Sequence, residues 1–332
     1  MVVRFLSRWY SQQRLKVCWN NVHSAEFGVS NGVRQGGVLS PILFSIYIDE
    51  LLVDLKRSRI GCSIGSEYYG AFAYADDIVI LAPSPSGLRL MLRKCEDFAG
   101  CHGLSFNPLK TQLIQFRWHS HHRIHPTINF CGQNLHLQED VVHLGHILTF
   151  NLSDEKDIKF RCQDMVRKAN SILCSFPKLS PQVLTYLYSA FCLSLYGCAL
   201  WNVSSKHIQA LEISFNKILR RIWNLPYNSH TRIVQQTAGL SSVFNLILKR
   251  CNSLFKMSQK CSSLFVKNIF LKSSTCCFTF LGFNLHCGHL YLKSYSVSDK
   301  FRSQAIRDLR LAQSFLSLPR SFIDSVIHSL AT

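Results

Sequence analysis

The sequence predicts an α+β fold, with an antiparallel sheet and its helices first and a purely helical part after them. Two observations indicate the first part: short β-type runs meet at residues 71–83, and apolar residues recur at helical spacing over 41–55 and 87–103. The second part begins near Asn151, where helical spacing takes over and continues to about Leu240. The 332 residues are 47% hydrophobic, which is enough apolar material for one large domain or two smaller ones.

The N-terminal elements lead into a glycine-bearing loop and a long helix. Residues 1–30 mix basic and aromatic positions, and short strands followed by a turn at 31–32 are expected near their end. The stretch GVRQGGVLSPILFSIYIDELLVDLKR comes next, and in it Ser40 and Pro41 mark a helix start. Apolar residues continue at helical spacing through Leu55, so the loop feeds a helix of several turns.

Residues 71–83, AFAYADDIVILAP, set two adjacent aspartates, Asp76 and Asp77, into an otherwise apolar run. The runs AFAY and IVILA predict a β-hairpin that presents both carboxylates at its tip. Two unit charges about 4 Å apart at an effective dielectric of ~20 repel by about 4 kcal/mol. Because the nearest basic residues in the sequence are Arg59 and Arg89, the compensating charge is expected from elsewhere in the fold or from a ligand.

The remaining segments are assigned by the same patterns. A helix is expected over SGLRLMLRKCEDFAGCHGL, a strand over FNPLKTQLIQF, and a strand or tight hairpin over VVHLGHILTF. Residues 241–298 lack clean periodicity, and a helix capped near Ser298 and ended by Pro319 is expected to close the chain. Three or four helices are expected in the helical part, with breaks at three prolines: Pro177, Pro181 and Pro226.

One uncharged stretch raises the question of a membrane. No charged residue occurs between Lys178 and Lys206, and VLTYLYSAFCLSLYGCALW within it approaches the ~20 residues that a membrane span needs. We interpret it as a buried core helix, with a membrane span as the alternative. The reason is a small-and-polar stripe at roughly helical spacing, formed by Thr185, Ser189, Ser194 and Gly197.

The charge balance indicates a polyanionic partner. Lys and Arg total 37 against 19 for Asp and Glu, a net charge of +18 with neutral histidines. The excess is uneven, because Ile213 to Ser298 contains no acidic residue while Lys and Arg recur throughout. Such an excess of positive charge predicts nucleic acid as the partner, with an acidic membrane surface as the weaker alternative.

The cysteines and histidines give no clear metal or disulfide pattern. The 14 cysteines are scattered and include no C-x-x-C pair, which argues against a disulfide scaffold and favours the reduced thiols of an intracellular protein. Two clusters have zinc-ligand types without the spacing of a zinc finger. They are His119, His121, His122 and His125, and Cys276, Cys277, His286, Cys287 and His289.

The motifs, taken in order, resemble a known polymerase family. GVRQGGVLSPILFSIYIDEL is followed by Tyr-Ala-Asp-Asp at 74–77, by Asn-Pro-Leu-Lys-Thr at 107–111 and by Leu-Gly at 144–145. This series is similar to the reverse transcriptase of non-LTR (LINE-type, jockey-like) retrotransposons, over roughly residues 1–240. The resemblance implies RNA-directed DNA polymerase activity on an RNA template and a DNA primer, with deoxynucleoside triphosphates as substrates. It also implies a partial palm over 1–150 and a helical thumb over 151–240, leaving a basic extension of unknown role at 241–332.

The resemblance also implies site residues. Two Mg²⁺ (or Mn²⁺) ions bridge primer and nucleotide phosphates in such polymerases, with Asp76 as the principal ligand and Asp77 as a supporting one. The loop at Gln35, Gly36 and Gly37 would contact nucleotide and template, as glycines allow close approach of the backbone. Lys110 would lie near the triphosphate, and Leu144 and Gly145 would form the primer grip. Four basic residues would contact the phosphate backbone of the nucleic acid: Lys217, Arg220, Arg221 and Arg232.

The sequence departs from the family at its beginning. The family's site also uses an upstream strand with a third aspartate, and here the one acidic residue before Asp49 is Glu26, in a different context. We therefore expect an N-terminally truncated polymerase that is inactive as this chain, located in the nucleus or cytoplasm and not bound to a membrane. The alternative is a non-catalytic nucleic-acid-binding remnant that keeps the basic surface.

Overall fold

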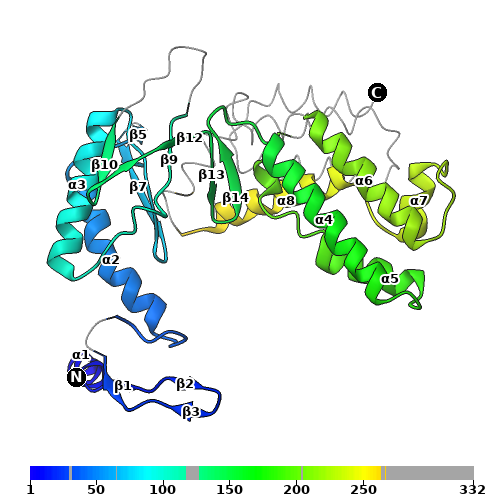
Figure 1. Ribbon diagram of the computed structural model, residues 1–332. Helices are drawn as coiled ribbons and strands as arrows, with labels where there is room; N and C mark the ends of the chain where they lie inside the picture. The colour runs from blue at the N-terminus through cyan, green and yellow to red at the C-terminus, as the bar shows by residue number, and fades with distance from the viewer. Residues whose placement is uncertain (30–31, 65, 117–126, 203–204, 263–265, 267–332) are drawn as a thin grey trace. The chain divides into compact units, whose positions relative to one another are not determined.

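The protein divides into two compact units in a computed structural model (Figure 1). Of the described residues, the first unit covers 1–113 and 127–137, and the second covers 114–116 and those from Gln138 on. The expectation of a mixed helix and strand fold with small antiparallel sheets is confirmed. The structure describes residues 1–29, 32–64, 66–116, 127–202, 205–262 and 266.

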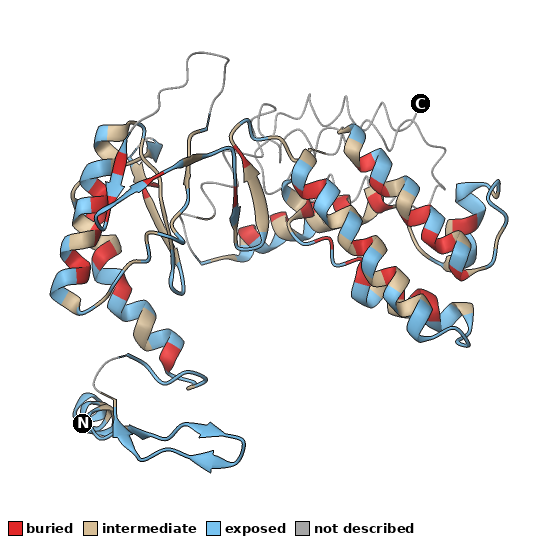
Figure 2. Cartoon of the chain, viewed as in Figure 1, coloured by how far each residue is buried: buried red, intermediate tan, exposed pale blue. Residues whose placement is uncertain are grey.

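The first unit begins with an exposed helix and two short strand pairs. α1 was not expected from the sequence, and nearly every residue of this segment is exposed (Figure 2). β1 pairs with β4, and β2 pairs with β3, both antiparallel. The bounds are α1 (Val2–Ser11), β1 (Arg14–Leu15), β2 (Cys18–Trp19), β3 (Val22–His23) and β4 (Phe27–Gly28).

The core of the first unit lies between two long helices and short strands. α3 is capped at its start by Ser84, whose side chain accepts a hydrogen bond of 3.2 Å from the Gly87 amide, and at its end by Gly103 in the left-handed conformation. The two helices bury residues at spacings of three and four, chiefly Leu51 and Leu55 of α2 and Met91, Cys95 and Phe98 of α3. The elements are α2 (Ser40–Arg57), β5 (Ser63–Ile64), β6 (Glu67–Tyr68), β7 (Ala71–Tyr74), β8 (Asp77–Ile80), α3 (Pro85–His102), β9 (Leu113–Ile114), β10 (Ile128–Phe130), β11 (Gln133–Leu135) and β12 (Leu137–Gln138).

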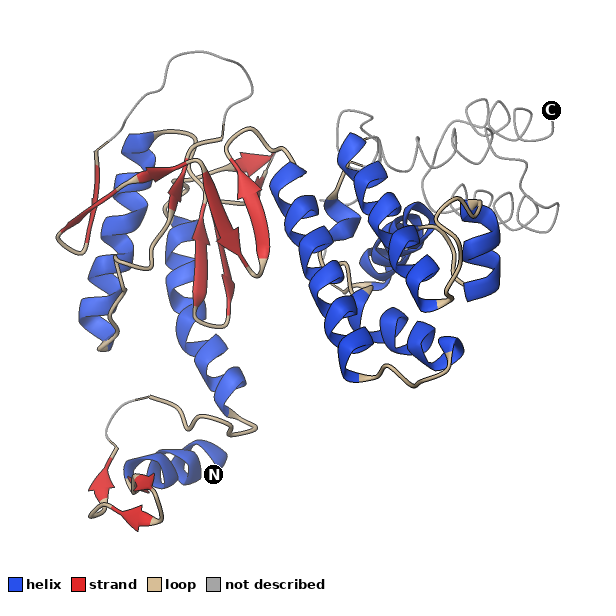
Figure 3. Ribbon diagram, turned by 45° about the vertical axis from the view of Figure 1, so that its right-hand side comes forward, coloured by secondary structure: helices blue, strands red, loops and turns tan. Residues whose placement is uncertain are grey.

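The second unit is a hairpin followed by packed helices (Figure 3). Its core is built by α4, α6 and α8 together with the segment after α5, and includes the fully buried Trp201, Leu211 and Phe215. The bounds are β13 (Asp140–His143), β14 (His146–Thr149), α4 (Glu155–Ser175), α5 (Pro181–Leu187), η1 (Tyr188–Cys192), η2 (Cys198–Leu200), α6 (Lys206–Ile222), α7 (Thr231–Ala238) and α8 (Val243–Lys260).

Three expectations for single elements are corrected. The strand expected over 106–116 is confined to Leu113–Ile114, because Asn107 begins a turn instead. The uncharged stretch is only partly buried: Tyr188 and Trp201 lie in the core, whereas Tyr186 and Phe191 are exposed. It is also not one helix, because α5 passes into the π-helical turn η1 and the chain then turns at Gly197 into the 3₁₀ turn η2. α8 fills part of 241–298, where no periodicity was recognised.

Other expectations are not tested by the structure. The helix expected between Ser298 and Pro319 lies outside the described residues. In the part of the chain that is described, no helix is long and apolar enough to cross a membrane. The proposed bounds of palm, thumb and extension remain predictions.

Candidate active site

The acidic pair sits at the tip of a tight β-hairpin, as predicted. β7 and β8 pair antiparallel with Ala71 opposite Ile80 and Tyr74 opposite Asp77, which leaves Ala75 and Asp76 as the two-residue turn. The inner residues of the hairpin pack against the core of the first unit, whereas residues 74–77 are all exposed. The hairpin thus holds both carboxylates in solvent on a base fixed by packing.

The turn itself is strained. Ala75 has a φ of 52°, a left-handed conformation that costs an L-residue with a Cβ roughly 1–2 kcal/mol. Of the two-residue hairpin turns, type II′ has positive φ at its first central position alone and normally places glycine there. The sequence therefore keeps a side chain where glycine would be easier, immediately before Asp76.

The charges of Asp76 and Asp77 are not compensated by the described residues. Neither carboxylate has a hydrogen bond or ion pair there, and no group of three His, Cys, Asp or Glu side chains in that part of the chain could hold a metal ion. Two exposed carboxylates fit a Mg²⁺ ion, which is usually bound by one or two carboxylates together with waters and substrate phosphates. The pair therefore fits a metal that a phosphate ligand completes, rather than a preformed protein cage.

The glycine loop is a turn that needs both of its glycines. The amide of Gly37 donates to the carbonyl of Arg34 at 3.0 Å, and Gly36 has a φ of 78°, which glycine adopts without strain. A Cβ on Gly37 would lie 2.7 Å from Ser40 Oγ and 3.1 Å from the Arg34 carbonyl. Gln35 is exposed at the top of this turn.

Ser40 joins the glycine loop to the body of the unit. Its hydroxyl donates to the carbonyl of Arg34, and its side chain is buried at the first residue of α2. α2 then packs against β7, the strand that leads to Asp76. The loop and the acidic hairpin are therefore both attached to the same helix, a link that the sequence alone did not suggest.

Lys110 lies on a separate turn of the same unit. The side-chain oxygen of Asn107 accepts hydrogen bonds from the amides of Leu109 (3.0 Å) and Lys110 (3.3 Å). The backbone carbonyl of Asn107 accepts a third hydrogen bond, from the Thr111 hydroxyl at 2.9 Å. This side-chain cap is the reason that the segment turns instead of extending. Lys110 is exposed on it.

Leu144 and Gly145 form the turn of the second unit's hairpin. β13 and β14 pair up to His143 opposite His146, and the two turn residues have φ values of 46° and 76°. Positive φ at both central positions is the type I′ pattern that matches the strand twist. Leu144 is 37% exposed at this tip.

The four basic candidates on α6 and α7 differ in their surroundings. Arg220 donates to the carbonyl of Ser229 from Nε (3.2 Å) and Nη2 (2.9 Å), and Arg221 donates to Asn170 Oδ1 at 2.7 Å. Lys217 and Arg232 are exposed. Lys217 and Arg220 also line a hollow with Glu212, Asn216, Tyr227, Asn228, Ser229 and Thr231.

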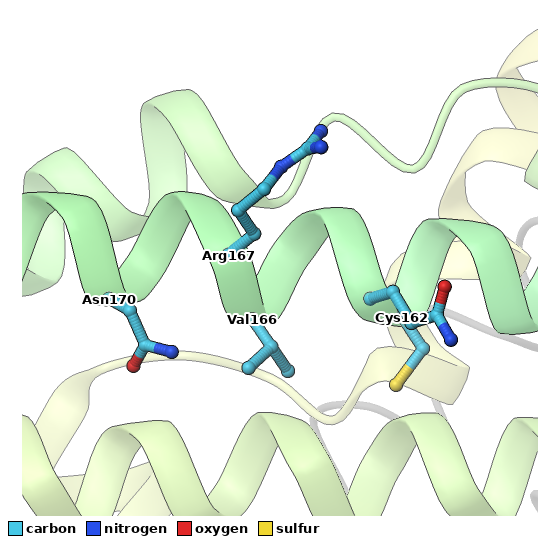
Figure 4. Close-up of a pocket in the computed structure, with 5 residues that line it drawn as sticks. Cys162, Val166, Arg167 and Asn170 are labelled. Carbon is cyan, nitrogen blue, oxygen red and sulfur yellow. The ribbon is translucent and has the colours of Figure 1, made fainter.

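A second hollow runs along α4, lined by side chains of that helix (Figure 4). Cys162, Val166 and Asn170 point to one side of this helix in Figure 4, whereas Arg167 points to the other. None of these residues was predicted to be functional. Both histidine- and cysteine-rich clusters considered for zinc lie outside the described residues.

Comparison with known proteins identifies the family to which these motifs are related. The reverse transcriptase (RNA-dependent DNA polymerase) family matches residues 2–148. The retrovirus-related Pol polyprotein from type-2 retrotransposable element R2DM of Drosophila melanogaster is 44% identical over 84 residues, which are 25% of this chain and 8% of that protein.

Two further relatives cover more of the chain at lower identity. The probable RNA-directed DNA polymerase from transposon X-element of Drosophila melanogaster is 23% identical over 256 residues, 74% of this chain and 27% of that protein. The RNA-directed DNA polymerase from mobile element jockey of Drosophila funebris is 23% identical over 250 residues, which are 70% of this chain and 26% of that protein. The chain thus spans little more than a quarter of these relatives, and the resemblance to jockey-like non-LTR reverse transcriptases is confirmed.

Proposed function

We propose that this chain acts in RNA-directed DNA polymerisation for a non-LTR retrotransposon, as part of the machinery that adds deoxynucleotides to a DNA primer on an RNA template. The observation that carries the proposal is the exposed acidic pair at the β7–β8 tip, uncompensated within the described residues and attached through α2 to a glycine turn. Reverse transcriptases as a family use divalent metal ions. The net charge of +18 supports a nucleic-acid substrate.

The proposed roles follow from what each side chain offers. Asp76 and Asp77 would hold the metal ions, which stabilise charge on the phosphates during in-line transfer when they are bound. Gln35, Gly36 and Gly37 would contact nucleotide and template, and the backbone of this turn is open to close approach at Gly36, where nothing lies within 4 Å of an added Cβ. Lys110 would neutralise charge on the triphosphate or donate a proton to the departing pyrophosphate.

The second unit would contribute the primer side of the reaction. Leu144 and Gly145 would form the primer grip, and the basic residues of α6 and α7 would contact the phosphate backbone. In this proposal residues 1–150 are a partial palm, which includes the hairpin at Leu144 and Gly145, and residues 151–240 are a helical thumb. RNA and deoxynucleoside triphosphates are found inside cells, so the proposal includes an intracellular site of action, in nucleus or cytoplasm.

A second function has one observation in its favour. Within the described residues the two aspartates have no third metal-binding side chain beside them. A chain with that donor set could bind template and primer through its basic surface without extending the primer. This second function is that of a non-catalytic nucleic-acid-binding protein, and it predicts binding of template and primer without primer extension.

Primer extension separates the two functions. The full chain is incubated with an RNA template, an annealed DNA primer, deoxynucleoside triphosphates and Mg²⁺ or Mn²⁺, beside Asp76→Ala and the control Asp97→Ala. Asp97 is exposed on α3 and is not part of the hairpin. Extension that falls by at least about 100-fold in Asp76→Ala and persists in the control supports the polymerase. Salt-sensitive binding without extension supports the alternative, and the absence of both overturns both proposals.

A further inference from the structure

We infer that Asp157 is a positioning residue for the Leu144–Gly145 turn, and that it fixes the backbone with which the turn meets the end of the primer. The inference rests on the proposed function of that turn as a primer grip. Every residue that carries it belongs to the second unit.

Asp157 is a fully buried carboxylate in the first turn of α4. Its Oδ2 accepts a hydrogen bond of 2.7 Å from the indole Nε1 of Trp201 and lies 3.1 Å from Nδ1 of His146. Its Oδ1 accepts from the amide of Ile147 at 3.2 Å. A buried carboxylate with partners on both oxygens holds the groups around it in one arrangement.

Two of these partners are the first residues of β14, directly after the turn. The backbone of Ile147 is bound through its amide, so the carboxylate fixes the path of the chain as well as a side chain. A substitution at Asp157 would therefore change the backbone at Ile147, two residues after Gly145, although Leu144 and Gly145 themselves keep their side chains.

Arg161 carries the same network into the turn. One turn further along α4, its Nη2 donates to the carbonyl of Gly145, and its Nε lies 3.8 Å from Asp157 Oδ1. Its guanidinium carbon stands 5.3 Å from the ring centre of Phe160 and 5.5 Å from that of Tyr196. Because its side chain is only 14% exposed, Arg161 is better suited to hold the turn than to reach a phosphate.

The segment before η2 is shaped to let this network close. Gly197 has a φ of 79°, and a Cβ there would lie 2.7 Å from Nδ1 of His146. Glycine thus allows the chain to approach the same nitrogen of His146 that faces Asp157. Tyr196, the preceding residue, lies 4.0 Å from where a side chain of Gly145 would begin.

The arrangement leaves one side of the turn available. The carbonyl of Gly145 and the residues His146 and Ile147 are bound inward, whereas Leu144 is 37% exposed. A turn held in this way presents a fixed surface to a primer terminus, which is the property that a grip requires. The network is therefore expected to act on recognition of the primer end more than on affinity for nucleic acid in general.

The test compares two nucleic acids with the same full chain. Fluorescence anisotropy measures binding to an RNA template with a recessed DNA primer and to the same RNA alone, for the wild type, Asp157→Asn and the control Asp164→Asn. Asp164 lies on the same helix and pairs with Arg167 and Lys168, not with the hairpin. We expect Asp157→Asn to weaken binding to the primed template at least fivefold more than binding to RNA alone, and the control to leave that ratio unchanged.

The other outcomes are equally decisive. A preference for the primed template that persists in Asp157→Asn overturns the inference alone. The absence of any such preference in the wild type overturns the proposed primer grip, and the inference with it. If circular dichroism shows that Asp157→Asn does not fold, Arg161→Lys replaces it in the binding measurement. This variant keeps the cation but loses the Nη2 donor to Gly145, and it should weaken binding to the primed template at least fivefold more than binding to RNA alone.

Discussion

A side chain on Gly37 would begin 2.7 Å from the hydroxyl of Ser40, at the point where the glycine turn meets α2. That hydroxyl already donates to the carbonyl of Arg34, which also accepts from the Gly37 amide. The turn and the helix start are therefore packed so closely that only hydrogen fits at Gly37.

The first prediction is that Gly37→Ala lowers the free energy of unfolding by about 1–3 kcal/mol, because the added carbon must displace Ser40 or the turn. The measurement is urea denaturation followed by circular dichroism. Gly100→Ala is the matched control: nothing lies within 4 Å of its added carbon, and alanine inside α3 should stabilise by about 0.8–1 kcal/mol. Equal effects at the two glycines would contradict the packing described here.

The sequence predicted the first unit well where local signals agree. The β-runs around Asp76 gave the hairpin, and Ser40 with Pro41 gave the start of α2. It failed at 106–116, where the apolar residues favour a strand but the Asn107 side chain caps a turn. The bond from Ser40 to Arg34 could not be predicted, because it depends on the folded shape of the loop.

The second prediction concerns the strain at Ala75. Ala75→Gly should raise the free energy of unfolding by up to about 1 kcal/mol, because relief of the left-handed conformation exceeds the entropy that glycine adds to the unfolded chain. Ala73→Gly is the control within the same hairpin. It lies inside β7, where glycine should cost about 0.5–1 kcal/mol. Denaturation of both variants measures the difference, and destabilisation by both would argue against strain at the turn.

The second unit was predicted less completely. The type and number of helices over 151–240 followed from periodicity and proline breaks, but the uncharged stretch before Lys206 was expected to be one helix. The helix instead ends at Leu193 after η1, and Leu195 and Gly197 then adopt positive φ values of 35° and 79°. Asp157 was missed because its partners, Trp201 and the start of β14, are distant in sequence. The available signal was an acidic residue directly before the apolar face of a helix.

The third prediction uses the titration of Asp157. Burial alone would raise its pKa, but the close approach of His146 and the hydrogen bonds from Trp201 and the Ile147 amide outweigh burial and hold the pKa below the ordinary value. The stability that the ionised group contributes is therefore present above its unfolded pKa of about 4 and lost as pH falls through the lower folded pKa. Asp157→Asn should cost about 1–3 kcal/mol at pH 7.

The pH dependence is the diagnostic part of that prediction. The difference in unfolding free energy between wild type and Asp157→Asn should shrink steadily below about pH 4, when the wild-type carboxyl becomes neutral. Denaturation at a series of pH values from 7 to 3 measures it. Asp164→Asn, whose carboxylate pairs with the exposed side chains of Arg167 and Lys168, should cost less than about 1 kcal/mol at pH 7. A difference that stays constant over the series would refute the proposed charge state of Asp157.

The last prediction separates two basic residues that line the same hollow. Lys217 is exposed and makes no hydrogen bond or ion pair within the described chain, whereas Arg220 holds the carbonyl of Ser229 with two donors. Lys217→Ala should leave the free energy of unfolding within about 0.5 kcal/mol of the wild type. If Lys217 contacts a phosphate, the slope of log affinity against log salt for the primed template should fall by about 0.7–0.9.

Arg220→Ala should behave in the opposite way. Loss of its charged donors to Ser229 should destabilise the second unit by about 1.5–3 kcal/mol, because the loop between α6 and α7 loses its anchor. Salt titrations by anisotropy and denaturation curves on both variants measure the two quantities. An unchanged salt slope in Lys217→Ala would remove Lys217 from the nucleic-acid interface, since an ion contact that releases no counterion is not a phosphate contact.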